Sequence, residues 1–131
     1  MSRENVEVVR RCVAARDRGD YSAARSLFDP ELVVDLSVRP DGRVYYVGPD
    51  ALRAMVEWVG LWEDYSYVAE EFLDAGDEVV VFFRESGRGR DSGVTAEILG
   101  ATVWTLGEGR VVRMKTYTDR SEALEAVGLS E

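Results

Sequence analysis

Two charged residues stand within segments that have the composition of buried β-strands. Asp35 lies in "ELVVDLSV", residues 31–38, and Arg84 lies in "EVVVFFRES", residues 78–86. An ionised side chain is costly to bury unless it is paired or used in chemistry. A carboxylate can take a proton from a substrate or position water, while a guanidinium can orient a carbonyl, carboxylate or epoxide oxygen. We therefore treat Asp35 and Arg84 as the candidate catalytic pair.

Less reactive arrangements of the same two residues are equally compatible with the sequence. Asp35 and Arg84 could form a buried ion pair that satisfies two charges without any chemistry. They could also lie apart, with Asp35 at an edge and facing water. The residues alone leave these alternatives open.

Other common reactive groups are scarce. The chain has no histidine, which removes the commonest general base and the commonest metal ligand. We accordingly expect no metal and no organic cofactor.

Cys12 is the single cysteine, which excludes an intrachain disulfide and is typical of a reducing compartment. The segment "GRGRDSG" (87–93) lacks the Lys-Ser/Thr ending of a phosphate loop and lies between two expected strands, which favours a hairpin loop.

Charge and hydropathy exclude several classes of partner. The 131 residues include 25 acidic and 16 basic side chains, for a formal charge of -9. This balance argues against binding to nucleic acid or to anionic membranes, which needs clustered Lys and Arg. The start is charged at once, without the apolar stretch of a signal peptide, and no apolar run approaches membrane-spanning length. We expect a cytoplasmic protein with one domain over residues 1–131.

The elements that must position these residues follow from hydrophobic periodicity. Helical spacing covers 3–17, and Asp20 can cap a short second helix that Pro30 ends. After the strand with Asp35, a helix is predicted over 48–62. Four strands then follow at 65–75, 78–86, 93–106 and 110–118, and a last helix runs from Asp119 to Gly128. This order predicts an α+β fold in which a curved, mostly antiparallel sheet folds over helices.

Several segments in this order carry a family resemblance. They are "RDRGDYSAARSLF", "VVDLSV", "GPDALRAMV", "DAGDEVVVFFR", "ATVWTLGEGRVVR" and "YTDRSEALEAVGL". The chain resembles the nuclear transport factor 2-like superfamily, in particular small bacterial SnoaL-like or ketosteroid-isomerase-like proteins. The resemblance implies a cone-shaped α+β barrel, with the N-terminal helices packed inside the sheet and a pocket at the open end. The superfamily includes isomerases, cyclases, epoxide hydrolases, dehydratases and non-catalytic binding domains.

The resemblance also bears on individual positions. It places Asp35 where ketosteroid isomerases carry their general base. It places Cys12 where they carry an oxyanion-binding tyrosine, and Thr102 about where they carry a protonated aspartate. Loss of one oxyanion donor typically costs roughly 10²–10³ in rate. Steroid isomerisation of the standard kind is therefore not expected.

Strand alternation predicts which side chains would share a pocket with an inward-facing Asp35. On this reasoning Arg84 points into the same cavity, and the helices supply aromatic side chains that close it. Trp58 and Trp62, one helical turn apart, could stack on a flat ligand, although that spacing is also typical of core residues. The expected ligand-binding residues are Tyr21, Trp58, Trp62, Phe82, Thr102, Trp104, Met114 and Thr116.

Two functions remain open at this point. The leading hypothesis is a small-molecule pocket protein: an isomerase, cyclase or hydrolase that acts on an apolar ligand through Asp35 and Arg84. The alternative is a non-catalytic ligand-binding or dimerisation module whose pocket is a residual void. An open cavity would favour the first, and a cavity plugged by Trp58, Phe82 and Trp104 the second. Apolar residues on the other face of the sheet, such as Leu99 and Val103, also predict a homodimer that packs through this outer face.

Overall fold

A computed structural model describes residues 2–37, 44–46 and 48–129 of the chain. The expected loop "RPDGR" (39–43) therefore lies outside the described residues, as does Val38. The described elements follow in this order: α1 (Ser2–Asp17), α2 (Tyr21–Ser26), β1 (Phe28–Asp35), β2 (Val44–Tyr46), α3 (Gly48–Gly60), β3 (Trp62–Ala75), β4 (Glu78–Gly89), β5 (Thr95–Gly107), β6 (Arg110–Tyr117) and α4 (Arg120–Ala126).

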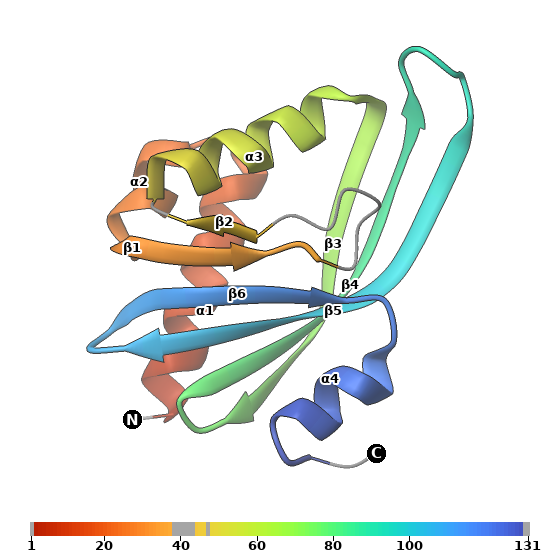
Figure 1. Cartoon of the computed structure of the whole chain (residues 1–131). Helices are drawn as coiled ribbons and strands as arrows, with labels where there is room; N and C mark the ends of the chain where they lie inside the picture. Colours follow the sequence, from red (N-terminus) through yellow and green to blue (C-terminus); the bar gives the residue numbers. More distant parts are fainter. Residues whose placement is uncertain (1, 38–43, 47, 130–131) are drawn as a thin grey trace.

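The strands form one mixed sheet that curves around α1 (Figure 1). Its order is β2-β1-β6-β5-β4-β3, so β3 to β6 form a meander of neighbouring strands. Only β1 and β6 pair in parallel; the other described pairs are antiparallel. Gly76 lies in the turn between β3 and β4, and Gly109 lies in the turn between β5 and β6. Their φ angles are 80° and 78°, a backbone conformation that other residues rarely adopt. The predicted α+β class with a curved, mostly antiparallel sheet is confirmed.

The core lies between the helices and the concave face of the sheet. The inward side of α1 presents Val9 and Cys12, which are almost fully buried against Val79 and Val81 of β4. Ala51 of α3 belongs to the same cluster. Because the apolar stripe of each helix needs an apolar surface to cover it, the sheet wraps around the helices and gives the expected cone.

Helix α4 packs against the outer, convex face of the sheet. Asp119 caps it, because its carboxylate accepts hydrogen bonds from the backbone N–H groups of Ser121 and Glu122. Ala123 packs with Val80 and Val103 in a second, smaller apolar cluster. The chain's own last helix therefore covers part of the surface that the sequence left open for a partner.

Several elements differ from the sequence-based expectation, among them β2, which was not predicted, and β4, which extends to Gly89 into the expected loop 87–93. Helix α2 ends at Ser26, and Pro30 lies within β1 at the point where the register with β6 shifts. Proline lacks an N–H group, so it is tolerated at such an irregularity of a strand. Helix α3 ends at Gly60, and Trp62 consequently begins β3 instead of extending the helix.

Candidate functional site

The register between strands decides which side chains face the interior of the cone. Val81 pairs with Thr102, Thr102 with Thr116, and Trp104 with Met114. Since directly paired residues point to the same face of a sheet, these side chains share the concave face. Val79, Val81, Phe83 and Glu85 of β4 lie on that face, and the even-numbered residues of β4 lie on the other. The expected inward placement of Phe82 and Arg84 is thereby corrected.

Asp35 lies on the outer side of β1. Its neighbours Val34 and Leu36 line the cone, and Val34 pairs with Met114, whereas Asp35 pairs with Lys115. The Asp35 side chain is only 9% exposed and its Oδ2 lies 3.3 Å from Nη2 of Arg113. Burial alone would raise the pKa of Asp35, but hydrogen bonds from Ser37 and the positive charges of Lys115 and Arg113 together lower it.

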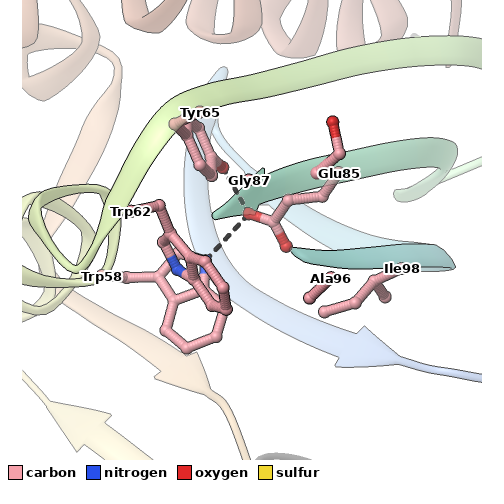
Figure 2. A pocket seen from close by; sticks show the side chains of 8 residues that line it. Trp58, Trp62, Tyr65, Glu85, Gly87, Ala96 and Ile98 are labelled. Carbon is pink, nitrogen blue, oxygen red and sulfur yellow. Dashed lines mark hydrogen bonds between the residues drawn. The ribbon is translucent and has the colours of Figure 1, made fainter. Parts of the chain in front are cut away.

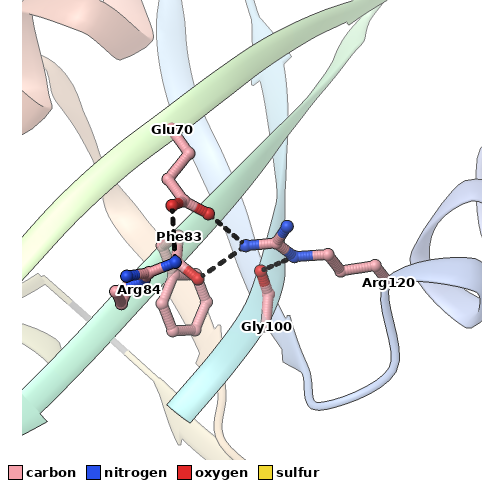
Figure 3. A network of polar contacts seen from close by, with 5 residues as sticks. All are labelled: Glu70, Phe83, Arg84, Gly100 and Arg120. Atoms are coloured by element: carbon pink, nitrogen blue, oxygen red, sulfur yellow. Dashed lines mark hydrogen bonds and ion pairs between the residues drawn. The ribbon is translucent and has the colours of Figure 1, made fainter. Parts of the chain in front are cut away.

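Arg84 is paired elsewhere on the outer face (Figure 3). Its Nη2 lies 3.5 Å from Oε2 of Glu70, while Arg120 donates to Oε1 of the same carboxylate at 2.7 Å. Arg120 also donates to the backbone carbonyls of Phe83 and Gly100, which ties α4 to the sheet. Strands β5 and β6 separate Arg84 from Asp35 by about 14 Å across the sheet, and the register places Arg84 four residues further along β4. The structure does not bring the candidate pair together.

Asp35→Asn should therefore behave as a stability variant. We expect it to lower the free energy of unfolding by about 1–2 kcal/mol at pH 7, because a charge-assisted contact to a half-exposed arginine is lost. A carboxyl whose pKa is lowered by folding stabilises the protein above its unfolded pKa of about 3.9 and loses that contribution as the pH falls through the folded value. Urea unfolding from pH 7 to pH 3 measures this, with the exposed Asp91→Asn as control. Equal stability of the two variants would contradict it.

The concave face encloses a small cavity, here called the inner cavity, of about 40 Å³. Its walls are Arg16, Val34, Leu36, Trp58, Tyr67, Phe83, Glu85, Thr102, Trp104, Met114 and Thr116. This volume holds a few water molecules and no polycyclic ligand. Five of the expected ligand-binding residues line it: Trp58, Thr102, Trp104, Met114 and Thr116. Their role toward a ligand stays a prediction.

Glu85 is the carboxylate that the sheet places on the wall of this cavity. It also lines the neighbouring crevice drawn in Figure 2, where dashed lines mark its hydrogen bonds. The residue is 5% exposed. Its Oε2 accepts hydrogen bonds from the Tyr65 hydroxyl and, at 2.9 Å, from Trp58 Nε1, while Oε1 has no hydrogen-bond partner among the described residues. One oxygen is thus held in place and the other is left to accept a proton. Glu85, like Asp35, is an acidic residue on an apolar strand, and that pattern could have identified it. It was missed because the even-numbered residues of β4 were expected to face the cavity.

Tyr65 connects Glu85 to a cation. Nη2 of Arg16 donates to the Tyr65 hydroxyl at 2.9 Å, and the guanidinium lies 4.5 Å from the ring centroid of Tyr67. Burial raises the pKa of Tyr65, and the charge of Glu85 adds to this effect while Arg16 opposes it. Burial likewise raises the pKa of Tyr67 to about 12. Both phenols are therefore protonated at neutral pH, and Tyr65 links Arg16 to Glu85 through two hydrogen bonds.

A wider hollow, here called the vestibule, adjoins the inner cavity and has a volume of about 430 Å³. It lies between the end of α1, the start of α2, the end of α3 and the beginning of β3. Its walls are Arg16, Asp17, Gly19, Tyr21, Val59, Tyr65, Ser66 and Tyr67. Arg16 and Tyr67 line both spaces and so form the boundary between them. Tyr21 belongs to the vestibule, as a candidate that closes the site from α2.

The two tryptophans near Glu85 meet, although not as neighbours on one helix. Trp58 of α3 and Trp62 of β3 form an edge-to-face pair with ring centroids 5.3 Å apart. Trp62 lines a crevice of about 10 Å³ beside Glu85 and does not reach the inner cavity. Nε1 of Trp62 and of Trp104 are buried without a hydrogen-bond partner among the described residues.

The family is decided by comparison with family models. Residues 9–114 match the model of the SnoaL-like domain. The chain belongs to the SnoaL-like domain family. The resemblance drawn from the sequence segments is thereby confirmed, and so is the nuclear transport factor 2-like fold. A search among curated proteins found no significant match.

Solved structures of other SnoaL-like and nuclear transport factor 2-like proteins share the fold. An NTF2-like protein from Burkholderia thailandensis E264 is 27% identical with a TM-score of 0.78, over 93% of this chain and 95% of that one. A protein from Jannaschia sp. CCS1, assigned to the SnoaL-like polyketide cyclases, is 21% identical with a TM-score of 0.79, over 99% and 95%. A protein with a ketosteroid isomerase-like fold from Catenulispora acidiphila DSM 44928, in complex with trimethylamine, is 18% identical with a TM-score of 0.72, over 94% and 93%.

Two kinds of feature are not found in the part of the chain that the structure describes. No three side chains of His, Cys, Asp or Glu come together there in a way that could hold a metal ion. None of its helices combines the length and the apolar character needed to cross a bilayer.

Proposed function

We propose that this SnoaL-like domain binds a small, largely apolar molecule at the open end of the cone and that Glu85 exchanges a proton with it. The observation that carries the proposal is the arrangement of the Glu85 carboxylate. Oε2 is held by Tyr65 and Trp58, whereas Oε1 has no partner in the described part of the chain. A general base needs this combination of a fixed position and a free lone pair.

The chemistry that fits this carboxylate is proton transfer at carbon or oxygen, as in isomerisation or cyclisation. The family includes polyketide cyclases and isomerases, so such a reaction lies within its range. The hydroxyl groups of Thr102 and Thr116 lie on the same inner wall and can donate to a substrate oxygen. Glu85 thereby takes the reactive role that the sequence suggested for Asp35 and Arg84.

The two spaces would hold different parts of the ligand. A volume of about 430 Å³ is within the range of ordinary small-molecule sites, roughly 300–1,000 Å³. The inner cavity, at about 40 Å³, accommodates only the reacting end of a ligand. The vestibule would therefore hold the body of the molecule and direct one end toward Glu85.

A non-catalytic binding module is the second candidate. The small inner cavity supports it, because Trp58 and Trp104 occupy space that a buried substrate would need. Phe82 takes no part in this obstruction, since it packs on the outer face with the α4 cluster. In this case the vestibule alone would hold the ligand, and Glu85 would serve to fix Tyr65 and Trp58.

Deuterium exchange distinguishes the two candidates without knowledge of the natural substrate. Small aryl ketones in D₂O are incubated with the protein, and incorporation of deuterium next to the carbonyl is followed by NMR. Quenching of tryptophan fluorescence by the same compounds reports binding, because Trp58 and Trp104 line the cavity. A general base accelerates the exchange of a bound ketone above the buffer rate. Quenching without accelerated exchange would favour the binding module.

We also propose that the protein forms a homodimer through the outer face of the sheet. Val68 and Leu99 flank Arg84 there and are 50% and 48% exposed, which supports an apolar contact beside the area that α4 covers. Light scattering at micromolar concentration should give twice the mass of the chain, and Leu99→Lys should reduce it to one. A monomeric wild-type protein would contradict this proposal. A cytoplasmic location stays a prediction based on the single cysteine.

A further inference from the structure

Arg16 is a half-buried cation for which the described residues supply no carboxylate partner. The described ion pairs all involve other arginines. Nη2 of Arg16 donates to the Tyr65 hydroxyl, and one face of the guanidinium is covered by the ring of Tyr67. A guanidinium has five N–H donors, so most of its donors remain available.

The position of Arg16 directs those donors to the ligand site. The side chain lines both the inner cavity and the vestibule, and it therefore lies at the point where a ligand passes from one to the other. A partly desolvated cation with unused donors is stabilised by an acceptor, and the planar fork of arginine matches a carboxylate. The contacts with Tyr65 and Tyr67 restrict the orientation of the fork, which reduces the entropy lost on binding.

The surrounding walls indicate what else the ligand must carry. Tyr21, Tyr67 and Val59 offer flat and apolar surface in the vestibule, which suits an aromatic ring. Asp17 also lines the vestibule, and its negative charge repels a ligand carboxylate. Because Asp17 is exposed, water and salt screen this repulsion. Glu85, the other nearby carboxylate, does not line the vestibule, and Tyr65 lies between it and Arg16 with a hydrogen bond to each.

We infer that Arg16 is the recognition residue for a ligand carboxylate, and that the site takes planar aromatic carboxylates with the ring in the vestibule and the carboxylate at Arg16. The inference rests on the proposed function, because it assumes that the ligand enters the cone through the vestibule. It adds the chemical class of the ligand and a residue that selects it.

Matched probes test the inference directly by isothermal titration calorimetry. 2-Naphthoate should bind about tenfold more tightly than 2-naphthamide, which has the same ring and no charge. Arg16→Met should abolish this preference, and Arg16→Lys should retain part of it. Arg11→Met, on the exposed side of the same helix, should leave it unchanged. Asp17→Asn should tighten binding of 2-naphthoate two- to threefold, roughly the effect of removing one screened charge.

Several outcomes would overturn the inference. These are equal affinity of the wild-type protein for acid and amide, an unchanged preference in Arg16→Met, or no binding of 2-naphthoate at millimolar concentration. Acetate binding as tightly as 2-naphthoate would also overturn it, since the ring would then contribute nothing. An NMR spectrum of each variant confirms that it is folded, and Arg16→Lys supplies the test if Arg16→Met is not.

The proposed function and this inference can fail separately. If Arg16→Met loses the preference for the acid while no bound compound exchanges a proton faster than in buffer, the ligand class stands and the reaction does not. If neutral ketones exchange in a Glu85-dependent way and carboxylates do not bind, the reaction stands and the ligand class does not.

Discussion

Glu85→Gln should lower the rate of protein-catalysed deuterium exchange by roughly 10²–10⁴-fold, the range that general-base catalysis contributes. Glutamine has nearly the same shape, and its carbonyl oxygen can still accept the hydrogen bonds that Tyr65 and Trp58 donate to Glu85. The side chain loses only its ability to take a proton. Binding, measured by fluorescence quenching, should therefore stay within a few-fold of the wild-type value while exchange is lost.

Glu97→Gln is the matched control for this substitution. Glu97 lies on β5 opposite Ser86, one position along β4 from Glu85, but it is exposed. The same chemical change there should leave both binding and exchange unaltered. Exchange that is equally fast in Glu85→Gln and in wild type would refute the role of Glu85, and equal losses in both variants would point to a general effect of charge.

Gly100→Ala should be the most damaging small substitution to stability. A Cβ atom at this position would lie 2.6 Å from the backbone oxygen of Tyr117 and 2.9 Å from the ring of Phe83. The backbone of β6 cannot move away without disturbing the strand pairing between β5 and β6. We expect the free energy of unfolding to fall by about 3 kcal/mol or more, and the melting temperature by roughly 10 °C.

The same substitution should also disturb the candidate site. Phe83 lines the inner cavity and stacks on Tyr67 with ring centroids 5.3 Å apart, so a displaced Phe83 ring shifts the wall that Arg16 contacts. Gly60→Ala is the control, because nothing lies within 4 Å of a Cβ atom there and its φ is not in the left-handed region. Calorimetric melting should show Gly60→Ala unchanged or slightly stabilised. A Gly100→Ala variant as stable as Gly60→Ala would contradict the expected clash.

Much of the fold could be predicted from local patterns. The helical spacing of α1, the Asp119 cap of α4 and the alternation along β4, β5 and β6 are properties of neighbouring residues in the chain. Each depends on a period of 3.6 or 2 residues or on a contact with the next turn. The same patterns, read as an ordered set of segments, were sufficient to identify the SnoaL-like domain.

The candidate site could be predicted only in part, because alternation defines two faces of a strand and does not say which one is inside. Thr102, Trp104, Met114 and Thr116 were placed correctly on the cavity wall. Arg84 was placed with them from an inward Asp35, and the register shows Asp35 and Arg84 on the outer face. Thr102 pairs with Val81, so the face assumed for β4 relative to β5 was wrong by one residue, and Arg84 was named in place of Glu85.

The sequence by itself determined that this protein is an acidic α+β chain of the SnoaL-like family with an ionisable side chain on a buried strand. Only the tertiary structure decided which ionisable side chain faces the cavity. Tyr65 of β3 and Trp58 of α3 reach Glu85, and Arg16 of α1 reaches Tyr65, across separations of 20, 27 and 49 residues along the chain. No periodicity relates residues so far apart, because their contacts depend on how the sheet curves around the helices and on which strands pair.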